Sequence, residues 1–349
     1  VMKQVLIGVG SGLVAGSLAL TLLFLGPLSP SASSEPTPTT VALPDATLSA
    51  APTPTESEAP IEPEVIECSV AELENAEGIL SLQAEVIDTE TDQVLFERSS
   101  DVAARAASVM KLFTAAAALE QLGPDYFVTT RVYMDAVDPS KIYLVGAGDV
   151  TLSRTEATKQ SVYRNAPKLQ TLAKKVLSVF GEDQILEIVL DSSLYGGTSG
   201  EYQSVWDQRG LTNGYMSPVS ALQVDGDREN PAAKDSPRSK DPVSQAGGWF
   251  QESLGDAALN ATISKGLAPA DAIEIASVKS RPISEWIDYM LVVSDNTLAE
   301  ALARLISLDV QLDGSFDSLT AAYKKALAKT GLDLSDLVVE DGSGLSKYN

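Results

Sequence analysis

The sequence contains no histidine and only one cysteine, Cys68, among its 349 residues. The absence of histidine excludes Ser-His-Asp triads, Cys-His dyads and histidine-ligated zinc, because each of these sites uses an imidazole. A single cysteine forms neither a disulfide within the chain nor a cysteine-rich metal site. If the protein is an enzyme, we therefore expect lysine, aspartate, glutamate or tyrosine to carry its protons. The sequence implies no metal and no cofactor.

Basic residues are unevenly distributed along the chain. There is no lysine or arginine between Lys3 and Arg98, whereas this stretch holds 15 acidic residues. Residues 98–349 carry 24 basic and 33 acidic residues, and the formal net charge of the whole chain is −23. Because nucleic-acid backbones are bound by clustered lysine and arginine, this charge predicts no nucleic-acid partner.

The first 67 residues combine an apolar run with a proline-rich stretch. Residues 5–26 form a run of 22 uncharged, mostly apolar residues behind Lys3, which is long enough to span a bilayer as a helix. We favour a signal-anchor at residues 1–26 over a cleaved signal peptide or a buried soluble helix. Residues 27–67 hold nine of the 18 prolines and predict a disordered linker. Together, the two segments predict that the globular part lies outside the cytoplasmic membrane.

The remaining sequence alternates strand and helix patterns. Two hairpins are expected, one from residues 79–87 and 94–97 and one from 129–134 and 142–145. Residues 185–190 predict a buried strand, and residues 225–242 predict a polar surface loop. Helices are expected at 108–122, 167–180, 282–292, 297–308 and 316–330. In the first of these helices, the apolar face is expected to consist of Val109, Leu112, Phe113, Ala116 and Leu119.

Two short motifs carry possible chemistry. Ser108 and Lys111 form the only Ser-x-x-Lys, at the start of a predicted helix, where residues three apart share a face. A neutral lysine there is able to take the proton of the serine hydroxyl, provided that its surroundings lower its pKa. Ser294 and Asn296 form the only Ser-x-Asn, at a break between two predicted helices. The alternatives are a capping serine with a surface lysine, and an ordinary helix N-cap at residues 294–296.

Both motifs, in this order on a chain without histidine, resemble those of penicillin-binding proteins and serine β-lactamases. Further segments narrow the resemblance to the D-Ala-D-Ala carboxypeptidase/endopeptidase family, the low-molecular-weight class C penicillin-binding proteins. These segments are 107–114 (ASVMKLFT), 118–125 (ALEQLGPD), 146–149 (GAGD), 215–222 (YMSPVSAL), 294–300 (SDNTLAE) and 341–346 (DGSGLS). The resemblance covers roughly residues 79–349.

The resemblance implies an α+β fold, with a transpeptidase-like domain of antiparallel sheet and helices interrupted by inserted smaller domains. The expected first part is 68–134, the insertion 135–270 and the second part 271–349. The family also implies peptidoglycan stem peptides as substrates and β-lactams as inhibitors. Membrane contact is expected through the N-terminal helix alone.

The family implies a role for each motif residue. Ser108 attacks the D-Ala-D-Ala carbonyl, and Lys111 takes its proton. Ser294 passes a proton to the leaving amine, and Asn296 orients the lysine and binds the substrate amide. The backbone N–H of Ser108 is expected to be one oxyanion donor. The alternatives are a β-lactamase or esterase on the same scaffold and a non-catalytic protein that binds the cell wall.

The third motif of the family, Lys-Thr-Gly on a strand, has no convincing counterpart. Lys329, Thr330 and Gly331 match its letters, but they precede segment 341–346 and close a predicted helix. We therefore expect that the sequence is truncated at its C-terminal end and lacks this motif, the second oxyanion donor and the last strands of the sheet. On this expectation, the chain itself shows little or no turnover.

Overall fold

The structure, a computed structural model, describes residues 77–79, 81–197 and 200–349. They belong to the unit formed by residues 72–349. The predicted anchor at 1–26 and the predicted linker at 27–67 lie outside the described residues. Among the residues that are described, no helix is both long enough and apolar enough to cross a membrane.

The first predicted hairpin is confirmed. Strands β1 (Ala84–Ile87) and β2 (Val94–Arg98) pair antiparallel. The carboxylate of Asp88 closes the turn, since its Oδ1 accepts hydrogen bonds from the backbone N–H groups of Glu90 at 2.8 Å and Thr91 at 3.1 Å. An aspartate at this position favours a turn because its side chain replaces a backbone acceptor.

A five-stranded mixed sheet forms the centre of the middle region. Its strand order is β6-β5-β4-β3-β7, with antiparallel pairs β3–β4 and β3–β7 and parallel pairs β4–β5 and β5–β6. The second predicted hairpin, β3–β4, is thereby confirmed. The strands are β3 (Thr129–Met134), β4 (Lys141–Val145), β5 (Glu187–Asp191), β6 (Thr262–Lys265) and β7 (Ile273–Lys279).

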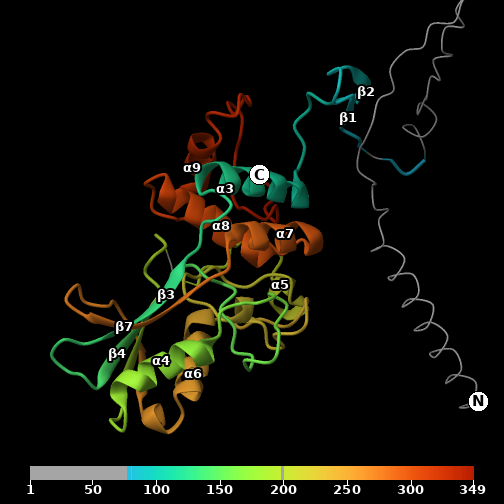
Figure 1. Ribbon diagram of the computed structural model, residues 1–349. Coiled ribbons are helices and arrows are strands. Elements are labelled where there is room, and N and C mark those ends of the chain that lie inside the picture. Colours follow the sequence, from blue (N-terminus) through green and yellow to red (C-terminus); the bar gives the residue numbers. More distant parts are fainter. Residues whose placement is uncertain (1–76, 80, 198–199) are drawn as a thin grey trace, which may run out of the picture. The chain divides into compact units, whose positions relative to one another are not determined.

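Helices α4 (Leu169–Phe180) and α6 (Pro242–Leu254) pack against each other and against the sheet (Figure 1). Helix α4 is amphipathic, and its apolar face is buried in the core beside the strands. Helix α6 was not predicted, because Gly247 and Gly248 weaken its helical pattern. A Cβ at Gly247 would lie 2.5 Å from a methyl carbon of Leu190, so glycine lets the helix approach β5 closely.

Four helices form a second core (Figure 1). They are α3 (Met110–Gln121), α7 (Ile283–Val293), α8 (Asn296–Asp309) and α9 (Leu319–Ala326). Helix α8 is buried over most of its length and contacts the other three. The shorter elements are η1 (Ala107–Val109), α5 (Arg209–Asn213), η2 (Asp225–Asp227) and η3 (Gly255–Ala258).

Two expectations about burial were wrong. Val109, Leu112 and Leu119 on the predicted core face of α3 are 58%, 56% and 41% exposed. Helix α3 instead packs against α8 and α9 through a face that includes Met110 and the buried Thr114. The predicted surface loop at 225–242 also buries several polar side chains, because Arg228 and Arg238 bond to backbone carbonyls and Arg228 also pairs with Asp295.

The strands of the five-stranded sheet come from all three of the predicted domain segments. Strands β3 and β7 lie in the same sheet as β4, β5 and β6, so the sheet extends a few residues beyond 135–270 at both ends. The division into 68–134, 135–270 and 271–349 stays a prediction.

Candidate active site

Ser108 lies in a strained turn at the start of α3. Its hydroxyl is exposed, and the preceding Ala107 has a left-handed backbone with φ of 45°. Left-handed backbone is costly for residues other than glycine and often occurs at functional sites. The segment 341–346 packs against this turn so closely that a Cβ at Gly344 would overlap the carbonyl of Ala107. The side chain of Ser108 is therefore exposed to solvent, while segment 341–346 packs against the backbone of the turn.

Lys111 is buried one helical turn beyond Ser108, with 2% of the residue exposed. Its Nζ lies 3.5 Å from the Oγ of Ser108. The same nitrogen donates hydrogen bonds of 2.7 Å to Oδ1 of Asn296 and 2.7 Å to the carbonyl oxygen of Ser343. The lysine therefore connects three stretches that are far apart in the sequence.

Burial lowers the pKa of Lys111, while Asp295, Asp341 and the ionised form of Glu300 oppose this change. A neutral amine has two N–H groups and one lone pair. Since the two short hydrogen bonds engage both N–H groups, the lone pair of a neutral Lys111 remains for the hydroxyl of Ser108. The geometry therefore suits a lysine that acts as a base.

The turn between α7 and α8 places Ser294 and Asn296. Ser294 ends α7 in a left-handed conformation, with φ of 59° and ψ of 47°. Its Oγ donates a 3.1 Å hydrogen bond to the Oγ of Ser108. Asn296 begins α8, and its Nδ2 donates to the carbonyl of Tyr215 at 2.9 Å. This bond fixes the amide so that its Oδ1 faces the lysine.

Asp295, between these two residues, supports the turn from inside the protein. Its carboxylate caps α8 by accepting the N–H of Leu298 at 2.9 Å. It also pairs with Arg228 at 2.8 Å, and both side chains are almost fully buried. Burial alone would raise the pKa of Asp295, but the neighbouring Arg228 and Arg238 hold it below its ordinary value. The N-cap, given above as the alternative interpretation of this motif, is provided by Asp295, and it coexists with the placement of Ser294 and Asn296 beside Ser108 and Lys111.

Segment 341–346 forms the wall behind the lysine. The carboxylate of Asp341 accepts hydrogen bonds from Nε1 of Trp206 at 2.7 Å and from the N–H groups of Gly344 and Ser346. The hydroxyl of Thr114 on α3 donates to the carbonyl of Gly342 at 2.7 Å. These bonds hold the backbone that presents the Ser343 carbonyl to Lys111.

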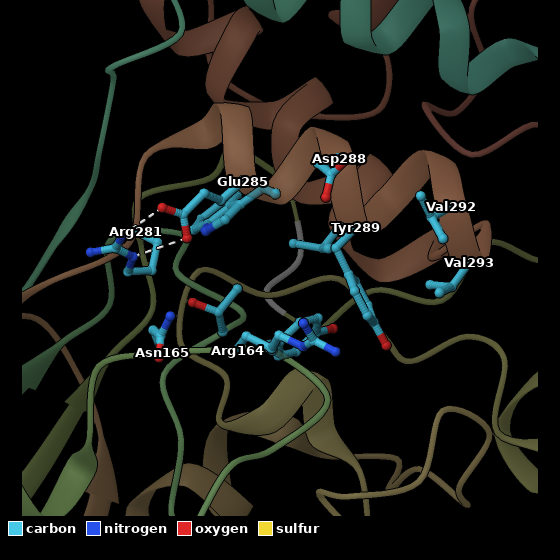
Figure 2. A pocket seen from close by; sticks show the side chains of 12 residues that line it. Arg164, Asn165, Arg281, Glu285, Asp288, Tyr289, Val292 and Val293 are labelled. Atoms are coloured by element: carbon cyan, nitrogen blue, oxygen red, sulfur yellow. Dashed lines mark hydrogen bonds and ion pairs between the residues drawn. The ribbon is translucent and has the colours of Figure 1, made fainter. Parts of the chain in front are cut away.

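A cavity of about 460 Å³ lies beside the turn between α7 and α8 (Figure 2). One wall is α7, with Tyr289 and Val293, and the opposite side carries Arg164. At one end, Arg281 and Glu285 form an exposed ion pair. Ser108 is not among its lining residues, so the cavity borders the turn between α7 and α8 but not the hydroxyl of Ser108.

The letters of the third motif, Lys329–Gly331, lie outside any strand. They follow the end of α9, where the N–H of Thr330 donates to the carbonyl of Leu327. In the described part of the chain, no group of three or more acidic or cysteine side chains is placed to hold a metal ion.

All four predicted side chains come together, namely Ser108, Lys111, Ser294 and Asn296. Sequence reasoning gave no role to the residues that hold them: Tyr163, Arg228, Asp295, Glu300, Asp341 and Ser343. Four of these lie in the segments 294–300 and 341–346 that carry the family resemblance, and only that resemblance could have pointed to them.

The chain is similar in sequence to bacterial carboxypeptidases. It is 31% identical over 264 residues to Carboxypeptidase DacB of Mycolicibacterium smegmatis, covering 76% of this chain and 56% of that protein. It is 28% identical over 327 residues to a D-alanyl-D-alanine carboxypeptidase of an Actinomadura species, covering 76% and 61%. The chain thus spans little more than half the length of these relatives.

The fold is similar to that of penicillin binding protein 4 from Haemophilus influenzae. The TM-score is 0.62 at 18% identity, covering 76% of this chain and 71% of that one. This confirms the predicted α+β architecture. The family model for D-Ala-D-Ala carboxypeptidase 3 matches residues 71–237 and 229–349, which is most of the chain. The protein therefore belongs to the D-Ala-D-Ala carboxypeptidase 3 (S13) family.

Proposed function

We propose that the protein is a serine-type D-Ala-D-Ala carboxypeptidase and endopeptidase that acts on peptidoglycan stem peptides. One observation carries this proposal: the hydroxyl of Ser108 lies beside both a buried lysine amine and the hydroxyl of Ser294. Membership of the S13 family supports the substrate class.

In the proposed first step, Oγ of Ser108 attacks the carbonyl carbon of the penultimate D-Ala, and Lys111 takes the hydroxyl proton. The backbone N–H of Ser108 donates to the oxyanion, a contribution of about 2.7–4 kcal/mol for one such donor. Ser294 then passes a proton to the leaving amine as the C–N bond breaks, while Asn296 binds the substrate amide. Water hydrolyses the resulting ester and restores the free serine.

β-Lactams are expected to acylate Ser108 because their ring amide occupies the place of the D-Ala-D-Ala amide. A related crystal structure of the Haemophilus influenzae protein is described as a complex with a novel β-lactam, and its fold is similar to that of this chain with a TM-score of 0.54. We also propose that the protein works outside the cytoplasmic membrane, with residues 1–26 as its anchor.

The test is covalent capture, because it detects a single acylation of each chain and needs no turnover, which is expected to be slow or absent without the third motif. Labelled penicillin should add one penicilloyl group at Ser108, identified by peptide mass spectrometry. Ser108→Ala should abolish this adduct, and Lys111→Met should slow its formation by about 100-fold or more, the range of general-base contributions. Lys329→Met is the matched control and should leave the rate unchanged.

The outcomes separate the alternatives. No adduct on the wild-type chain would contradict the proposal and favour a non-catalytic wall-binding protein. Rapid release of the adduct, together with hydrolysis of a chromogenic cephalosporin, would favour a β-lactamase. Loss of labelling in Lys329→Met would restore a role for residues 329–331.

A further inference from the structure

Glu300 is one of three buried acids near Lys111, with Asp295 and Asp341. It lies on α8 one turn after Asn296, with 1% of the residue exposed. Its Oε1 accepts the backbone N–H of Ser343 at 2.9 Å. The carbonyl of the same residue, Ser343, accepts the hydrogen bond from Nζ of Lys111 at 2.7 Å. A single residue therefore connects Glu300 to the lysine.

From this chain of contacts we infer that Glu300 is a positioning residue for Lys111, which it orients through Ser343. The inference rests on the proposed function, because it concerns the base of that reaction. If the Ser343 carbonyl moves, one N–H of a neutral Lys111 loses its acceptor, and the lone pair is no longer directed at Ser108. A misplacement of a catalytic group by about 1 Å lowers the reaction rate on the order of 100-fold.

The surroundings of Glu300 favour its neutral form. Burial raises its pKa to about 8, and the neighbouring carboxylate of Asp341 acts in the same direction. Arg304 on the same helix opposes this change, and Lys111 on α3 and Tyr323 on α9 complete the ionisable groups around it. Its Oε2 has no hydrogen-bond partner in the described part of the chain.

A neutral Glu300 explains how an acid is tolerated next to a lysine that must lose its proton. An ionised carboxylate would raise the pKa of Lys111 and favour the ammonium form. A neutral carboxyl keeps the hydrogen bond from Ser343 without adding this charge. The position therefore requires an acceptor and does not require a negative charge.

The test compares two substitutions at this position with one elsewhere on α8. Glu300→Gln keeps an acceptor and is neutral, whereas Glu300→Leu removes the acceptor at similar volume. Ser307→Ala is the control, because Ser307 is equally buried on α8 but bonds to Ser318 and Gly314. Each variant is checked by circular dichroism and urea unfolding before use.

Two readouts are measured, the rate of Ser108 acylation by labelled penicillin and the pKa of Lys111 by NMR with lysine labelled at its ε carbon. The Lys111 resonance is assigned with Lys111→Met. Glu300→Gln should acylate within about threefold of wild type, with the same Lys111 titration. Glu300→Leu should be slower by about 10–100-fold and shift the Lys111 resonance. Ser307→Ala should change neither readout.

Two results would overturn the inference. One is a folded Glu300→Leu variant that acylates at the wild-type rate with an unchanged Lys111 resonance. The other is a Glu300→Gln variant as slow as Glu300→Leu with a lowered Lys111 pKa, which would show that the negative charge matters. If the wild type forms no adduct, the proposed function fails, whereas the NMR comparison still decides whether Glu300 positions the lysine.

Discussion

The buried ion pair between Arg228 and Asp295 allows a quantitative test of how the Ser294 turn is held. Both side chains are nearly inaccessible, at 2% and 3% exposed. Replacing Arg228 by methionine leaves the carboxylate buried, with hydrogen bonds from the N–H of Leu298 and the hydroxyl of Tyr163. Removing one partner of a buried pair costs about 3–5 kcal/mol, and the remaining bonds suggest the lower end for Arg228→Met. This is a large share of a typical free energy of unfolding of about 5–15 kcal/mol.

The assay is urea unfolding at pH 7, followed by circular dichroism, on Arg228→Met, Asp295→Asn and the double variant. The double variant should be more stable than the sum of the single changes predicts, with a coupling free energy of about 2 kcal/mol or more. Arg281→Met is the matched control, because its pair with Glu285 is 45% and 43% exposed. An exposed pair of this spacing is worth about 0.3–0.5 kcal/mol.

The pH dependence gives an independent check. Because the folded-state pKa of Asp295 lies below its ordinary value of 3.8, its contribution is present above pH 3.8 and is lost as the pH falls through the folded pKa. Asp295→Asn should remove this part of the acid unfolding transition. The reasoning is refuted if Arg228→Met unfolds within about 1 kcal/mol of wild type, or if it behaves like Arg281→Met.

Three further outcomes are expected. Gly344→Ala should slow Ser108 acylation by labelled penicillin about tenfold or more, because φ at Gly344 is 84° and a methyl group there would overlap the carbonyl of Ala107. An unchanged acylation rate would contradict this prediction. Glu300→Gln should become more stable relative to wild type as the pH rises from about 4.5 to about 8, because over this range the wild-type Glu300 keeps its proton only in the folded state. The free energy of unfolding of both proteins is measured by urea titration at several pH values. A stability difference that does not change with pH would contradict this prediction. Tyr323→Phe should lose about 1 kcal/mol in urea unfolding, because its hydroxyl lies 2.7 Å from that of Thr114; no loss would show that this bond contributes nothing.

Local patterns predicted much of the fold and of the candidate site. The spacing of Ser108 and Lys111 placed both on one side of a helix, and the cap residues at 294–296 marked the break between α7 and α8. Such features depend on residues three or four apart, so they are readable along the chain. The hairpin strands β1–β2 and β3–β4 were predictable for the same reason.

Long-range contacts explain what could not be predicted. The bond from Ser343 to Glu300 joins residues 43 apart, and the pair of Arg228 with Asp295 joins residues 67 apart. No local pattern reports that a loop arginine will be buried. The apolar pattern of α3 also pointed to the wrong face, because the buried side accommodates Lys111 and Thr114 among small residues. Hydrophobicity alone does not identify a helix face that buries a lysine and a threonine.

The contacts of Lys111 have a consequence for the biosynthesis of the protein. Its two acceptors lie 185 and 232 positions further along the chain. A polypeptide that is still being translated therefore contains Ser108 long before the groups that hold the amine of Lys111 beside it. On the proposed function, Ser108 becomes reactive only after residue 343 has been synthesised and has folded back onto α3, so the order of synthesis protects the nascent chain from premature acylation.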